Sequence, residues 1–157
     1  MKFQKGQSVV EFALILPLFL LFIFGIIYFS MIFLDYMTLT TIARNSAREA
    51  AVATEAQYDY ASKRFPEIEK HYKTQTLPVD IYDWNPSLDS DFKIYYQPST
   101  DTSSNGNVVA EVHAKLNDDG SWLANIVNGL SGNQNTNKLD LDITCTMYSE
   151  TKWNDKK

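Results

Sequence analysis

The sequence predicts an α+β protein in which a long amino-terminal transmembrane helix extends into a small antiparallel β-sheet domain. Two observations predict this fold. Residues 12–34 form an apolar run without a formal charge, and three segments of the second half alternate apolar with polar residues. The length of 157 residues suits one domain plus an appendage.

The overall composition excludes several classes of protein. With 45% hydrophobic and 13% aromatic residues, the chain is expected to fold. A net charge of −5 without a basic patch argues against a nucleic-acid partner. Cys145 is the one cysteine, which excludes an intrachain disulfide and a cysteine-based zinc site. Since His71 and His113 stand in no ligand spacing, we expect neither a metal site nor a cofactor.

The apolar run has the length and the flanks of a membrane anchor. Its 23 residues would make a helix of about 34 Å, enough to cross a hydrocarbon core of about 30 Å. The run is longer than the core of an ordinary secretory signal. Lys2 and Lys5 precede it, so the positive-inside rule places the amino terminus in the cytoplasm and the carboxy-terminal domain outside. We therefore expect a single-pass membrane protein with a transmembrane helix over residues 7–34.

Three residues break the apolar pattern of this helix. Pro17 cannot donate a hydrogen bond to the carbonyl of Ala13, so a kink or local loosening is expected, either merely tolerated or used for flexing. Gly25 allows the same two interpretations. An acid at the edge of an apolar run costs free energy unless it reaches the interface or meets a cation. Glu11 therefore lies at headgroup level or has a partner.

The residues around Gly6 resemble a known processing signal. The stretch MKFQKG followed by QSVVEF resembles that of type IV pilins, a short basic leader ending in glycine with glutamate as the fifth residue of the mature chain. The resemblance implies that a membrane-embedded prepilin peptidase cuts between Gly6 and Gln7 on the cytoplasmic side and removes residues 1–6. Glu11 would then neutralise the new α-amine of Gln7, in its own or a neighbouring chain.

The resemblance becomes narrower over residues 6–53. The segments VVEFALILPLFLLFIFGI and ARNSAREAAV are similar to the TadE-like minor pilins (pseudopilins) of tight-adherence pilus systems. Many related subunits carry tyrosine after the glutamate, and Phe12 keeps the aromatic ring beside Glu11. The resemblance implies a structural subunit involved in assembling a Tad-type, type IV-like pilus for surface adhesion. Its partners would be the prepilin peptidase, other pilin subunits, the Tad assembly machinery and membrane lipid.

Residues 35–65 change to an amphipathic pattern, which predicts that the helix continues beyond the membrane. Its mostly small, apolar residues fall near one face at three- and four-residue steps. This face either packs on the protein's own sheet, which we favour, or contacts another subunit. The helix is expected to end or bend near Phe65, because the residue before a proline avoids the helical region. The face comprises Met37, Ile42, Ala43, Ala47, Ala50 and Ala51.

Residues 66–157 predict an extracytoplasmic α+β module. Pro66 opens a short helix that runs to about Thr74. Alternating segments predict strands at residues 92–96, 108–116 and 139–147, with a shorter edge strand at 79–84. The further expectations are a hairpin loop at 98–107, a helix at 122–130 and a polar loop at 131–138. Because each strand has one apolar face, we expect the soluble part of the long helix to cover the sheet.

The sequence shows no arrangement typical of catalysis. His113 is expected on the polar face of its strand and Cys145 on the apolar face, as a small core residue. No nucleophile–base pair or phosphate-binding loop is apparent, so we expect no enzyme. Solvated loop charge is favoured over a calcium site for the acidic residues Asp80, Asp83, Asp89, Asp91, Asp118 and Asp119.

Two functions of different classes remain open at this point. The first is the structural pilus subunit that the resemblance implies. The second is an uncleaved, signal-anchored membrane protein whose outer domain binds a ligand or partner. The first requires Gly6 and Glu11, whereas the second predicts that both are replaceable.

Overall fold

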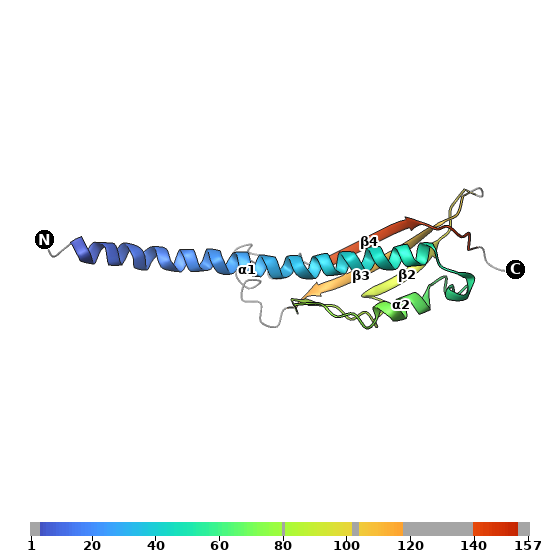
Figure 1. The fold of residues 1–157 in the computed structure, drawn as a ribbon, viewed down its shortest axis with the longest axis horizontal. Coiled ribbons are helices and arrows are strands. Elements are labelled where there is room, and N and C mark those ends of the chain that lie inside the picture. The colour runs from blue at the N-terminus through green and yellow to red at the C-terminus, as the bar shows by residue number, and fades with distance from the viewer. Residues whose placement is uncertain (1–3, 80, 102–103, 118–139, 154–157) are drawn as a thin grey trace.

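The computed structural model describes residues 4–79, 81–101, 104–117 and 140–153, with side chains from Val9 onward. Helix α1 (Gln4–Ala51) is a continuous helix of 48 residues, or about 72 Å. Figure 1 shows its amino-terminal half projecting from a small domain, while its carboxy-terminal half lies along the sheet. The predicted α+β architecture, a long apolar helix followed by a small antiparallel sheet, is confirmed.

The sheet is built around strand β3 (Asn107–Leu116), which pairs antiparallel with each of the other strands. These are β1 (Tyr82–Asp83), β2 (Phe92–Gln97) and β4 (Leu141–Tyr148). Ala110 of β3 shows the register of the sheet. Ile94 of β2 lies opposite it on one side, and Cys145 of β4 lies opposite it on the other. The predicted strands are thus confirmed where the structure describes them, and β1 is shorter than the expected edge strand.

The predicted hairpin joins β2 to β3 and includes one glycine that the turn requires. A Cβ atom on Gly106 would lie 2.2 Å from the carbonyl oxygen of Gln97 and 2.7 Å from the ring of Tyr96. The Gly106 amide donates to the hydroxyl of Tyr96 at 3.0 Å. Only a residue without a side chain fits there unless the hairpin shifts.

Helix α1 covers the apolar face of the sheet, as its amphipathic pattern predicts. The core combines one stripe of the helix with the inward residues of β2 and β3. Met37 departs from the predicted stripe, because its side chain is half exposed. The buried helix residues are Leu39, Ile42, Ala43, Ala47 and Ala50, and the strand residues are Phe92, Ile94, Val108, Ala110, Val112 and Ala114.

The prediction that the helix extends through residues 35–65 is wrong beyond Ala51. The Ala51 carbonyl accepts a hydrogen bond from the Glu150 amide, across from the end of β4, so the chain leaves the helix there. A short 3₁₀ helix (Glu55–Gln57) follows, and Tyr58 then stacks on Trp153 with ring centroids 4.5 Å apart. Burial of this aromatic pair outweighs the helical propensity of the segment.

Helix α2 (Pro66–Tyr72) begins at the predicted proline and ends two residues before the predicted Thr74. The predicted helix at 122–130, the polar loop at 131–138, and the acidic residues Asp80, Asp118 and Asp119 lie outside the described residues.

Candidate functional site

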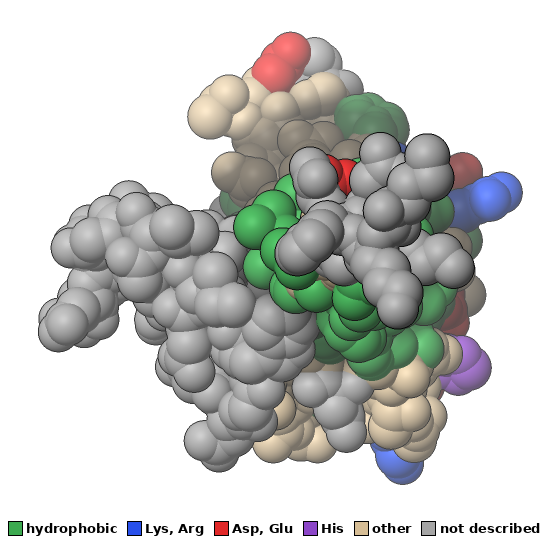
Figure 2. Space-filling view, turned by 90° about the vertical axis from the view of Figure 1, so that its left-hand side faces the viewer, with side chains coloured by type: hydrophobic (Ala, Val, Ile, Leu, Met, Phe, Trp, Pro, Cys, Tyr) green, Lys and Arg blue, Asp and Glu red, His purple; other side chains and the backbone are tan. Residues whose placement is uncertain are grey.

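The projecting half of α1 is the most unusual surface of the molecule. Nearly all of its large apolar side chains between Val9 and Leu34 are exposed, most of them by half or more. Seen end-on in Figure 2, hydrophobic side chains surround the described part of the helix. Within the described residues, α1 is the single helix long and apolar enough to cross a membrane. Its sequence and exposure indicate a membrane anchor.

The sequence-predicted processing residues lie in the first turns of this helix. Gly6 and Gln7 are both helical, and α1 passes without a break from Gln4 to Glu11. Glu11 lies four positions after Gln7, which corresponds to about one helical turn and about 6 Å along the axis. The two residues therefore lie on nearly the same face of the helix. The side chain of Glu11 is exposed on the helix surface, next to Phe12, which is 64% exposed.

Pro17 lies inside α1, with the helix continuing on both sides. Because proline has no N–H group, the carbonyl of Ala13 lacks its usual donor four residues on. The helix nevertheless remains continuous through this position.

The three alanines expected to pack the helix, Ala43, Ala47 and Ala51, all lie against the domain. Ala43 and Ala47 are fully buried in the core, and Ala51 is 6% exposed. This agrees with the favoured interpretation, in which the small residues let α1 approach the protein's own sheet closely.

Asp35 is a buried carboxylate at the junction between the apolar run and the domain. Its side chain is fully buried, and its two carboxylate oxygens accept hydrogen bonds from the backbone amides of Val79 (3.1 Å) and Ile81 (3.3 Å). A buried carboxylate is tolerated only when such donors replace its water. Asp35 therefore ties a loop that is more than forty residues away in sequence to one position along the axis of α1.

In the sequence, Asp35 stands out only as the first charged residue after the apolar run of residues 12–34. A signal was nevertheless present: Asp35, Leu39, Ile42 and Ser46 recur at four-, three- and four-residue steps, and all four are buried. An acid on the buried stripe of a helix indicates a partner that must come from elsewhere in the fold.

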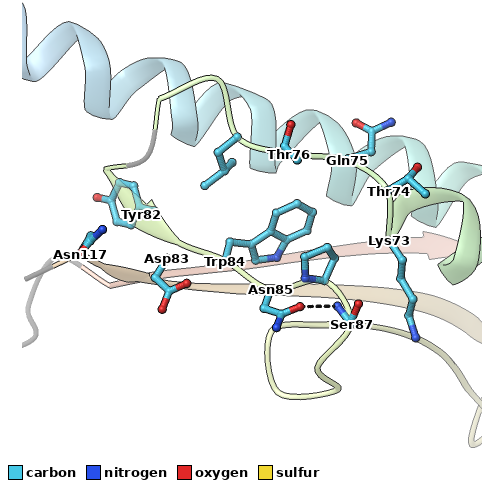
Figure 3. Close-up of a pocket in the computed structure, with 12 residues that line it drawn as sticks. Lys73, Thr74, Gln75, Thr76, Tyr82, Asp83, Trp84, Asn85, Ser87 and Asn117 are labelled. Carbon is cyan, nitrogen blue, oxygen red and sulfur yellow. Dashed lines mark hydrogen bonds between the residues drawn. The ribbon is translucent and has the colours of Figure 1, made fainter. Parts of the chain in front are cut away.

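A polar groove of about 460 Å³ opens beside α1, between residues 73–77 and 82–87 (Figure 3). Trp84 lies at its centre, and its indole N–H donates to the carbonyl of Asp91 at 3.2 Å. The other polar side chains offer hydroxyl, amide, carboxylate and ammonium groups. They belong to Lys73, Thr74, Gln75, Thr76, Asp83, Asn85, Ser87 and Asn117, with the apolar Leu77, Tyr82 and Pro86 completing the wall.

A charged cluster joins α2 to β2. Arg64 donates two hydrogen bonds of 3.0 Å to the carboxylate of Glu69, which is buried and also accepts the Ile94 amide at 2.9 Å. Arg64 also donates to Asp89, and this contact raises the pKa of the guanidinium and holds the pKa of the Asp89 carboxyl below its usual range. Asp89 is thus paired with a cation rather than grouped with other acids.

The outer face of the sheet carries a second set of polar pairs. Lys93 and Tyr95 both reach the carboxylate of Glu111, at 2.7 Å each, and His113 pairs with Asp142. Burial would raise the pKa of Glu111, but these two hydrogen bonds outweigh it and the pKa is lowered. His113 lies on the polar face, as predicted. In the part of the chain that the structure describes, no three His, Cys, Asp or Glu residues lie close enough to hold a metal ion.

Cys145 is half-buried on the inward face of β4, where it packs against the core. This agrees with its predicted place on the apolar face. Its neighbours on that face, Leu141, Ile143 and Met147, are also only half-buried.

Comparison with known families matches residues 6–48 to the family described as TadE-like protein. The match falls within residues 6–53, on which the sequence resemblance rests, and confirms that resemblance over nearly the whole of α1. It is consistent with a membrane protein associated with a Tad pilus. Comparison with curated proteins and with solved structures found no significant match.

Proposed function

We propose that this chain is a TadE-like minor pilin, a membrane-anchored structural subunit that takes part in assembling a Tad-type pilus for surface adhesion. A prepilin peptidase cuts it between Gly6 and Gln7. The observation that carries the proposal is the placement of Glu11 one turn beyond Gln7, at the start of a TadE-like helix whose apolar side chains are exposed.

The chemistry of the cut explains why an acid is useful there. Hydrolysis of the Gly6–Gln7 peptide bond leaves a positively charged amine on Gln7, at the membrane face of the helix. A lone amine or a lone carboxylate is costly in an apolar bundle, whereas the pair offsets much of that cost. Glu11 therefore neutralises the amine of its own chain or of a neighbouring subunit as helices pack together.

The remaining parts of the proposal follow from this anchor. Lys2 and Lys5 hold the amino terminus in the cytoplasm, where the peptidase cuts, and the sheet domain lies outside the membrane. The partners are the peptidase, other pilin subunits and the Tad assembly machinery. The role is structural rather than catalytic.

A second function is favoured by one observation, the polar groove beside Trp84. In this alternative the chain is an uncleaved, signal-anchored protein, and its outer domain binds a ligand or partner in the groove. Gly6 and Glu11 would then be replaceable without effect.

Three substitutions at the amino-terminal end separate the two functions. We expect Gly6→Ala to leave the leader attached, because the peptidase acts at this glycine. Glu11→Ala and Glu11→Gln should be cut normally but should reach the sheared surface fraction at least about tenfold less, since the amine loses its partner. The readouts are the gel mobility of the chain and its amount in the sheared fraction.

Phe12→Tyr is the matched control, because it keeps the ring beside Glu11 and introduces the residue that many related subunits carry. It should be cut and assembled like the unmodified protein. Normal surface levels of Glu11→Gln would rule out the charge-pairing role of Glu11.

A further inference from the structure

The part of α1 that the domain does not cover is about as long as the hydrocarbon core of a membrane is thick. The helix is largely exposed from Val9 to Ile27, a stretch of 19 residues or about 28 Å, close to a hydrocarbon thickness of about 30 Å. From Tyr28 onward the domain lies against it. Burial raises the pKa of Tyr82, and the nearby hydroxyl of Tyr28 adds to that effect, while Ile32 packs on the core.

Among the described residues, Asp35 ties one mostly apolar segment of the domain to α1: residues 76–79 with Ile81, which we call the proximal loop. Pro78 is exposed, and Leu77, Val79 and Ile81 are only half-buried. Figure 3 shows the first loop residue, Thr76, and the preceding Gln75 beside α1. One exposed and three half-buried apolar residues beside a membrane-spanning helix fit a lipid interface better than bulk water.

Asp35 fixes the height of this loop without exposing a charge to lipid. Its carboxylate is fully buried and faces the amides of Val79 and Ile81. On the helix, Tyr28 lies about two turns before Asp35, on the side of the free helix, and Tyr36 directly follows Asp35. Tyrosine is enriched at membrane–water interfaces because its ring is apolar and its hydroxyl is polar.

We propose that the proximal loop rests in the lipid headgroup layer of the membrane that α1 spans. The domain then sits directly on the lipid surface and is not raised on a helical stalk. This inference rests on the membrane anchoring in the proposed function, but not on leader cleavage or on pilus assembly. Its partner is the headgroup and upper acyl region of the bilayer.

Site-specific fluorescence quenching tests this contact in the full-length chain. Cys145→Ala removes the native thiol, and single cysteines are introduced at Pro78 and, as a second loop position, at Thr76. Each variant is labelled with bimane and reconstituted in phosphatidylcholine–phosphatidylglycerol vesicles containing a headgroup nitroxide lipid. Phe33→Cys, on the exposed helix surface, reports the membrane, and Thr100→Cys, in the hairpin at the opposite end of the sheet, reports water.

We expect Pro78→Cys and Thr76→Cys to be quenched at least about twofold more than Thr100→Cys, and to approach Phe33→Cys. If both loop labels behave like Thr100→Cys while Phe33→Cys is quenched, membrane anchoring by α1 is supported and the proposed lipid contact of the proximal loop is wrong. If Phe33→Cys is not quenched either, both the contact and the anchoring in the proposed function fail.

Discussion

Asp35 shows how a single buried carboxylate joins two parts of this molecule. Helix α1 continues through it, so its side chain is placed by the helix and not by a loop. The two backbone amides that donate hydrogen bonds to it, those of Val79 and Ile81, belong to a segment with little regular structure. The carboxylate thus adds to the backbone hydrogen bonds of this segment, which run from the Ile81 amide to the Val79 carbonyl and from the Asn117 amide to the Ile81 carbonyl.

Replacement of Asp35 by asparagine is therefore expected to destabilise the domain. An amide side chain offers one acceptor oxygen, so it can accept from only one of the two backbone N–H groups, and its NH₂ group would face the other. The expected loss is about 1–3 kcal/mol in the free energy of unfolding, measured by denaturant titration in detergent micelles. Asp83→Asn, on the exposed end of the sheet, is the control and should change stability by less than about 0.5 kcal/mol. Equal stability of the two variants would contradict the role of Asp35.

Tyr72 makes a pH-dependent contribution to stability. Burial, together with its hydrogen bond to Glu49, raises the pKa of Tyr72 to about 12 from an ordinary value of 10.0. Folding therefore favours the neutral phenol, so its stabilising contribution is complete below pH 10 and is lost as the pH rises toward 12. We expect unmodified protein to lose more stability than Tyr72→Phe between pH 9 and pH 11.5, measured as the shift in urea midpoint. Parallel pH profiles of the two proteins would disprove this assignment.

At the scale of elements, α2 is held to the sheet by Glu69 as well as by its buried residues Ile68 and Tyr72. Its carboxylate accepts the Ile94 amide of β2 and two hydrogen bonds from Arg64. The sequence pairs Glu69 with Lys73 at helical spacing, but in the structure this carboxylate turns inward to the strand.

Glu69→Gln is expected to lower the free energy of unfolding by about 2 kcal/mol, because charge-assisted hydrogen bonds to a buried group are lost. Glu67→Gln, an exposed acid of the same helix, is the matched control and should be nearly neutral. Thermal unfolding followed by circular dichroism measures both. A loss of similar size in the control would show that the helix responds to charge in general and not to this contact.

The elements that the sequence predicts best are those whose pattern is local. The apolar run, the start of α2 at Pro66 and the alternation in β2 and β3 depend on residues a few positions apart, and each is present. The end of α1 at Ala51 depends instead on Glu150, about a hundred residues later, and on the stacking of Tyr58 and Trp153. Local propensity has no access to such contacts, which is why the helix was expected to run on to residue 65.

The candidate site divides in the same way. Gly6, Gln7 and Glu11 lie within six consecutive residues. The placement of Glu11 one turn beyond Gly6 and Gln7 on α1 therefore follows from helix geometry alone. The partners of Asp35 are backbone amides more than forty residues away, and a backbone amide leaves no signature in the sequence.

At the scale of the whole molecule, α1 has two functions. Its first half is an exposed apolar rod, and its second half is the main cover of the sheet, with Ala43 and Ala47 buried. One uninterrupted helix carries both halves, so the domain is coupled to the anchor through a continuous helical backbone. This coupling suits a subunit that must move from a membrane into a filament as one body.

The central claim is that the amino-terminal segment is a processing signal and not simply an anchor. The most direct test is the intact mass of the chain, purified from cells with an active prepilin peptidase and from matched cells without it. We predict a chain that begins at Gln7 in the first case and one that retains residues 1–6 in the second. A chain that still begins at Met1 in peptidase-competent cells would contradict the account.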